Sequence, residues 1–336
     1  MDFVFQKTLP DSDVGLLFRE PFIKTGYRQP YRPWSYYIGS LFRVHNETLN
    51  VWSHLAYLAI FLRHVYVLRA ELDYSADPLA WPMLGFAAGT IAYTALSAMA
   101  HLLQSRSEMS HYVCYQLDYA GIGLNAVGNG LLVYYMVATE TFYRWFGWFF
   151  IPVNFLLGFF DCACMGVAML WFPKPYPYQR KIWQMGSTGF HVLFAMWPLA
   201  HKIVETLYSQ GTMSPSVVLP HAHYSAWFLF SVSFFASHVP ERLLPGAFDM
   251  VGHGHQIFHL AVGYCSWLQY EVGLLEMKTR PRHLVAMANP NGTTIFGGIL
   301  AVVLGDLIFL VCTHNWRKKI CAEDVKRRLR RKKRLE

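Results

Sequence analysis

Runs of about 20 apolar residues recur along the chain, and each is long enough to cross a bilayer as an α-helix. Eight such runs stand near residues 50–69, 79–104, 111–138, 142–171, 184–207, 218–238, 251–273 and 294–314. Of the 336 residues, 54% are hydrophobic and only 15% are charged, a balance typical of integral membrane proteins. We therefore expect an all-α, polytopic membrane protein with eight transmembrane helices.

Basic residues gather on both polar flanks of this apolar region. Eleven Lys and Arg lie between Arg317 and Arg334 against three acids from Glu323 to Glu336, a local balance equal to the +8 net charge of the whole chain. Residues 1–48 also carry an excess of Lys and Arg, which marks the cytoplasmic side of a membrane protein. We expect both termini in the cytoplasm and a tail that favours anionic membrane lipids, with no nucleic acid as partner.

Charge and hydropathy divide the chain into three regions. Residues 1–48 are a cytoplasmic segment with an interfacial helix, 49–315 are the transmembrane domain, and 316–336 are a basic cytoplasmic tail. One loop departs from the charge rule, because Lys278, Arg280 and Arg282 lie where this topology needs the outside. The glycosylation sequon at Asn291 falls on the same outer side.

Four ionisable residues from three predicted spans fall at one depth near the inner surface. His101 ends the second span, with Ser97 one helical turn before it on the same face, and Asp118 lies near the start of the third. His255 and His259 open the seventh span four residues apart, so both imidazoles share a helix face. Three imidazoles with one open position form the usual reactive zinc site. We therefore predict Zn²⁺ bound by His101, His255 and His259, with Asp118 and Ser97 as candidate catalytic residues.

The alternative is a cluster of buried polar groups that bond to one another and to backbone carbonyls. A second polar group opens the first span, where Glu47, Asn50 and His54 share a helical face. They are either outer groups that support the metal ligands or a hydrogen-bonded helix start. Asp161, within the fourth predicted span, is a candidate for a polar ligand contact. His191, within the fifth, is interpreted as structural or interfacial.

These motifs, in this order, resemble the progestin and adipoQ receptor family. The matching stretches are Asn-Glu-Thr-Leu-Asn-Val-Trp-Ser-His (46–54), Ser-Ala-Met-Ala-His (97–101), Leu-Asp-Tyr-Ala-Gly-Ile (117–122) and Gly-His-Gly-His-Gln-Ile-Phe-His (252–259). Within the family, the alpha and beta membrane progestin receptors are most similar, through Phe-Arg-Glu-Pro (18–21), Gly-Tyr-Arg (26–28) and Ser-His-Val-Pro-Glu-Arg-Leu-Leu-Pro-Gly (237–246).

The resemblance implies a receptor for progestin steroids that signals rapidly at the plasma membrane, with a zinc site on the family's three histidines. It carries those positions to His101, His255 and His259, the aspartate to Asp118 and the serine to Ser97. In the related adiponectin receptors, the same residues are associated with ceramide hydrolysis. Those receptors have seven spans. The eighth span predicted here departs from that plan and fits the progestin-receptor branch of the family.

Two functions follow as hypotheses. A receptor would admit an apolar progestin or other lipid ligand from the bilayer into a cavity lined by some of the 25 Phe, 20 Tyr and 11 Trp. A zinc-dependent hydrolase of lipid amides such as ceramide would use Asp118 to accept a proton from the attacking water. A rhodopsin-like receptor fits poorly, because receptors of that class have their N-terminus outside the cell, whereas the basic residues here predict a cytoplasmic N-terminus. A G protein remains a possible partner, bound through a surface unlike that of rhodopsin-like receptors. The sequence does not determine the oligomeric state.

Overall fold

The computed structural model describes residues 7–70, 72–172, 178–212 and 214–335, and α-helices dominate it, as predicted. The helices are α1 (Trp34–Gly39), α2 (Thr48–Leu68), α3 (Ala80–Leu103), α4 (Glu108–Val137), α5 (Glu140–Trp171), α6 (Tyr178–Ala195), α7 (Trp197–Gln210), α8 (Pro215–Ser237), α9 (Gly254–Thr279), α10 (Arg282–Ala288), α11 (Gly292–Cys312) and α12 (His314–Leu335). Short 3₁₀ turns link several of them.

Five of the helices in these ranges are long and apolar enough to cross a membrane. They are α2, α3 with its following turn (Ala80–Arg106), α4, α5 and α11. The other predicted spans coincide with α6 and α7, α8, and α9, which fall short by length or composition. The chain is thus a multi-pass membrane protein, and the crossing of all eight segments stays a prediction.

The run predicted at 184–207 is divided at Met196. Pro198 stands in the first turn of α7 and has no N–H for a helical hydrogen bond. Even so, Met196 N–H donates to the Val192 carbonyl over 2.9 Å, and Ala200 N–H donates to the Met196 carbonyl over 3.0 Å. The two helices therefore follow each other as one interrupted segment.

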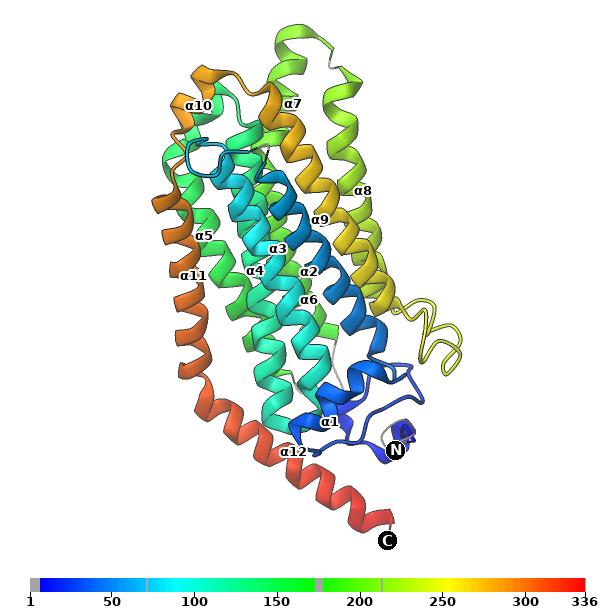
Figure 1. The fold of residues 1–336 in the computed structure, drawn as a ribbon. Coiled ribbons are helices and arrows are strands. Elements are labelled where there is room, and N and C mark those ends of the chain that lie inside the picture. The colour runs from blue at the N-terminus through cyan, green and yellow to red at the C-terminus, as the bar shows by residue number, and fades with distance from the viewer. Residues whose placement is uncertain (1–6, 71, 173–177, 213, 336) are drawn as a thin grey trace.

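Helix α4 occupies the centre of the bundle. In its most apolar stretch 89% of the residues are buried, against 22% for α2 and 17% for α11, which therefore lie at the periphery. Figure 1 shows the N-terminal segment, α1 and α12 at one end of the bundle, and α10 and the start of α8 at the other. We call the first the α12 end. The first and last described segments of the chain both lie there.

Glycines bring α3 and α4 into backbone contact. A Cβ atom on Gly89 would lie 2.5 Å from the Leu124 carbonyl oxygen, and one on Gly121 would lie 2.7 Å from the Cα of Tyr93. Small residues of this kind drive helix association in membranes, where packing replaces the hydrophobic effect. The contact holds the end of α3 against the start of α4, which places His101 relative to Asp118.

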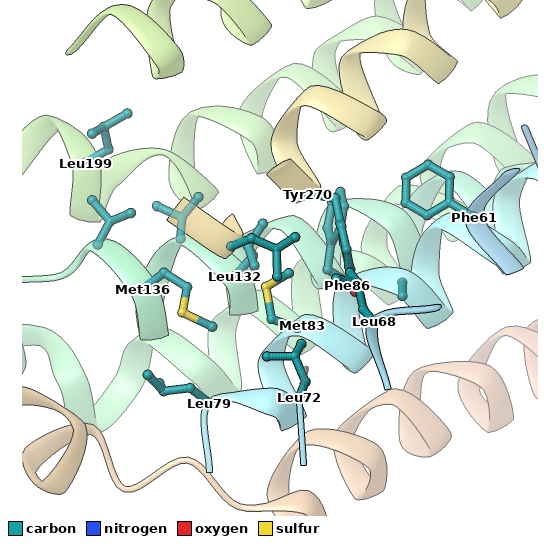
Figure 2. Packing of buried hydrophobic residues seen from close by; sticks show 14 residues of the cluster. Phe61, Leu68, Leu72, Leu79, Met83, Phe86, Leu132, Met136, Leu199 and Tyr270 are labelled. Atoms are coloured by element: carbon teal, nitrogen blue, oxygen red, sulfur yellow. The ribbon is translucent and has the colours of Figure 1, made fainter. Parts of the chain in front are cut away.

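A large apolar cluster fills the bundle at the end away from α12. It joins the end of α2, the start of α3 and the end of α4 through Phe61, Met83 and Met136, with Tyr270 from α9 (Figure 2). Phe61, Met83 and Met136 have no exposed surface. This packing fixes the helices at one end, whereas buried polar residues are concentrated towards the α12 end.

Candidate metal centre at the α12 end

The end of α3 is held by an arginine from the N-terminal segment. Arg28 is buried, and its guanidinium donates to the carbonyls of His101 and Leu102, each over 2.6 Å, and to the Ser40 hydroxyl over 3.0 Å. A cation satisfies the otherwise unpaired carbonyls at a helix C-terminus and interacts favourably with the helix dipole. This contact fixes the last turn of α3, which carries His101.

The start of α9 is held by a carboxylate. Glu241 accepts a 2.6 Å hydrogen bond from the first backbone N–H of α9, that of Gly254. His253, which precedes the helix, lies with its Nε2 atom 3.2 Å from the Asn46 carbonyl. The first turn of α9 is thus tied to the segment that leads into α2. His255 lies in this first turn and His259 one turn further, somewhat closer to the helix start than the hydropathy boundary suggested.

The structure brings the three predicted histidines together where α2, α3 and α9 meet. The Nε2 atom of His255 lies 3.2 Å from Nε2 of His101 and 3.1 Å from Nε2 of His259. One ring nitrogen from each residue falls within 4.8 Å of the other two. His101 and His259 are buried and His255 is partly buried. Three imidazoles from two helices therefore face one point.

The opposite ring nitrogens show which protonation state this geometry requires. Nδ1 of His101 lies 2.8 Å from Oε2 of Glu47, and Nδ1 of His259 lies 3.1 Å from the Asn50 carbonyl. Both partners accept, so both Nδ1 atoms donate, and the neutral rings present Nε2 lone pairs towards His255. His255 can donate a proton to only one of them. A cation between the rings would satisfy all three lone pairs, so the donor set fits a metal such as zinc.

Glu47 is the carboxylate beside this cluster. It is 3% exposed and also accepts a 2.6 Å hydrogen bond from Asn50. Burial opposes its ionisation, but the electrostatic interaction with the His101 ring and the hydrogen bonds from His101 and Asn50 outweigh burial and hold the pKa of Glu47 below its usual range. Metal-bound histidines commonly donate their second N–H to such a carboxylate. Of the two interpretations left open for Glu47 and Asn50, the contacts with the histidines favour the supporting role.

His54 lies on the other side of the cluster. Its ring stacks on that of His259, with the centroids 3.8 Å apart and the planes at 20°. The three polar residues that open α2 therefore all touch the histidine cluster directly or through one another.

Asp118 and Ser97 border the cluster but lie outside the compact group of ring nitrogens. The Asp118 carboxylate interacts electrostatically with His101 and accepts a hydrogen bond from the Ser97 hydroxyl. Both residues are buried. The structure thus places all five predicted site residues in one region, with the histidines at its centre.

Two polar contacts were missed in the sequence, one in this region and one outside it. From its sequence context, Arg28 is one of several N-terminal basic residues. The only signal that it has a special role is its place in the Gly-Tyr-Arg stretch (26–28), which contributes to the family resemblance. His191, interpreted as structural, forms a 2.6 Å contact with Asp161 in the bundle interior. That pair belongs to a separate polar cluster.

Comparison with known proteins agrees with this arrangement. Residues 42–270, which include all three histidines, match the sequence profile of the haemolysin-III-related family. The chain belongs to this family. The resemblance to the progestin and adipoQ receptors is thereby confirmed.

Curated relatives are similar over most of their length. The chain is 39% identical to membrane progestin receptor beta of Homo sapiens over 81% of this chain and 77% of that protein. It is 35% identical to membrane progestin receptor beta of Sus scrofa over 97% of this chain and 90% of that protein. It is also 35% identical to membrane progestin receptor alpha-B of Danio rerio, over 82% and 78% of the two chains.

Proposed function

We propose that this protein is a plasma-membrane receptor for progestin steroids, with eight crossings and both termini in the cytoplasm. The observation that carries the proposal is the 35% identity over 97% of the chain to a relative named membrane progestin receptor beta. The position of both chain ends at the α12 end, together with the positive charge there, supports the orientation.

The metal in this proposal is Zn²⁺, bound by the Nε2 atoms of His101, His255 and His259. Glu47 and the Asn50 carbonyl orient two of these rings from behind. Because α2, α3 and α9 all contribute, bound zinc would link the helices at the α12 end, where the large apolar cluster of Figure 2 does not reach.

The steroid site in this proposal is the groove between α8 and α9. Its volume is ≈ 600 Å³, and apolar side chains dominate its walls, which are formed by Ser216, Leu219, Pro220, His223, Leu268, Glu271, Val272 and Leu275. A progestin has an apolar ring body and a few polar oxygens, which suits a mostly apolar groove with a few polar groups. A ligand dissolved in the bilayer would reach this face from the side.

Radiolabelled progesterone binding to the purified protein tests the site. Leu275 lines the groove, whereas Leu260 on the same helix does not, and both are 51% exposed. We expect Leu275→Trp, which fills the groove, to weaken progesterone binding at least tenfold and Leu260→Trp to leave it unchanged. Equal effects of the two substitutions would remove the groove from the proposal, and no binding by the unmutated protein would remove the receptor function.

Hydrolysis of a lipid amide is a second candidate function. One observation favours it: Asp118, a buried carboxylate, lies beside His101 and receives a hydrogen bond from Ser97. A carboxylate in this position can accept a proton from a water molecule that attacks a carbonyl. Bound zinc would supply Lewis acidity at the same point. The receptor remains the preferred function, because the named relatives support it directly.

A further inference from the structure

A second polar cluster lies between α4, α5, α6 and α11, away from the three histidines. Asp161 on α5 and His191 on α6 have no exposed surface, and Oδ2 of Asp161 lies 2.6 Å from Nδ1 of His191. The other ring nitrogen of His191 lies 3.2 Å from Oδ1 of Asn154. The amide group of Asn154 donates to the Val127 carbonyl over 3.0 Å, which fixes Oδ1 towards the ring.

His191 therefore faces an acceptor at each ring nitrogen. A neutral imidazole has one donor and one acceptor, so only the imidazolium satisfies both contacts. The pair of Asp161 and protonated His191 is then electrically neutral. Any further charge in the cluster needs its own partner.

Asp306 on α11 brings that further charge. It is only 6% exposed, and neither carboxylate oxygen has a hydrogen-bond partner of normal geometry. The Cys162 thiol lies close enough for a weak hydrogen bond outside that geometry, and the charge of Asp161 also acts on Asp306. A thiol is a weak donor and cannot replace the water that an ionised carboxylate loses on burial.

The orientation of Asp306 towards the bundle follows from the packing of α11. Ile295 and Val302 are buried on the same face of α11, a helix that packs against α5, α4 and α3 and lies beside α5 in Figure 1. A Cβ atom on Gly298 would lie 2.1 Å from the ring of Phe155, so only glycine allows this approach. Asp306 extends the same row at helical spacing and so points at α5 rather than at lipid.

Other acceptor oxygens in the cluster also lack donors. Oδ1 of Asp161 and Oε1 of Gln116 are both buried without a hydrogen-bond partner. The Gln116 amide group instead donates to the carbonyl and the sulfur of Cys162, over 3.3 and 3.2 Å. Acceptor oxygens on α4, α5 and α11 are thus left without donors, and the charge of the Asp306 carboxylate has no counterion, so the cluster carries a net charge of minus one.

We propose that this cluster binds one monovalent alkali cation, held by Asp306, Oδ1 of Asp161 and Oε1 of Gln116. Carboxylate and amide oxygens are the ligands that hard cations prefer. A single positive charge neutralises the cluster, as buried charges in a membrane require. The cation would join α11 to α4 and α5.

Thermal unfolding of the purified, zinc-loaded protein in detergent tests this site. Na⁺, K⁺ and choline chloride are compared at equal ionic strength. We expect Na⁺ or K⁺ to raise Tm by several degrees in a saturable manner relative to choline, since a ligand that binds only the folded state stabilises it. The difference between the Na⁺ and K⁺ curves identifies the preferred ion.

Asp306→Asn removes the charge and keeps the shape, so its Tm should no longer depend on the cation. Glu140→Gln, which alters an exposed ion pair with Arg144, is the matched control and should respond like the parent. Retention of ²²Na⁺ or ⁸⁶Rb⁺ by the parent, and its loss in Asp306→Asn, gives a second readout. A parent Tm that is the same in all three salts would overturn the proposal and leave Asp306 holding a proton, whatever the variants do.

Discussion

Replacing Glu47 by Gln tests the histidine cluster most sharply. The substitution keeps an acceptor oxygen near Nδ1 of His101, at present 2.8 Å from the carboxylate, but removes the charge. A hydrogen bond to a charged group contributes about 1.5–3 kcal/mol and a neutral one about 0.5–1.5 kcal/mol. The loss is therefore about 1.2 kcal/mol, which corresponds to somewhat less than a tenfold loss of zinc affinity. Glu47→Ala also leaves the N–H without an acceptor, and we expect roughly a hundredfold loss.

The assay is competition for zinc between the purified protein and a chromophoric chelator at neutral pH. Glu108→Gln is the control, because Glu108 is also buried at the α12 end but accepts a hydrogen bond from Tyr31, 2.7 Å away, instead of from a histidine. It should bind zinc like the parent. Unchanged affinity in both Glu47 variants would refute the supporting role of this carboxylate. Unchanged affinity in a double variant with His255→Ala and His259→Ala would refute the zinc site itself.

Three further predictions follow from contacts near the same end. Nδ1 of His45 accepts from the Glu47 N–H, so the ring is neutral, and burial with the charge of Arg28 lowers its pKa to about 3. As the pH falls below about 6.5, His45 is protonated in the unfolded chain before it is protonated in the folded one. The free energy of unfolding should therefore decrease by at most about 1.4 kcal/mol per pH unit. The Tm of His45→Gln should depend less steeply on pH than that of the parent. Arg28→Lys loses the planar fork that bridges two carbonyls and a hydroxyl, so Tm should drop by several degrees in the same unfolding assay, whereas an unchanged Tm would contradict the capping role. If the protein hydrolyses lipid amides, Asp118→Asn should abolish release of sphingoid base while zinc and progesterone binding persist, and no release by the parent would exclude the activity for the lipids tried.

The histidine cluster was predictable because each part of it follows a local rule. The spacing of His255 and His259 fixes their shared face, and the polar positions at the ends of long apolar runs fix their depth. What the sequence could not supply is the partner of each second ring nitrogen. That depends on how α2 packs against α3 and α9, and only the structure shows that Glu47 reaches His101 while a backbone carbonyl of α2 reaches His259.

The eight predicted crossings exceed the five helices of the described ranges that meet the criteria of length and hydropathy, for a physical reason. A segment that packs against neighbours can carry polar residues on its inner face, which lowers its mean hydropathy without preventing insertion. His221 on α8 and Glu276 on α9 are of this kind, with a 3.1 Å contact between them. Such helices fall below a threshold of length and composition even where their position in the bundle matches that of a span.

Asp306 was overlooked because α11 is otherwise the most apolar of the candidate spans, and one acid does not alter its periodicity. Its meaning depends on three residues far away in the chain, since Asp161 already has His191 as its counterion and Gln116 directs its amide group at Cys162. A buried ionised side chain is tolerated when it has a partner, whereas one without a partner requires a proton or a bound ion. Helix α11 therefore does more than extend the bundle. In the proposed cation site, α11 supplies the negative charge that the bound ion neutralises.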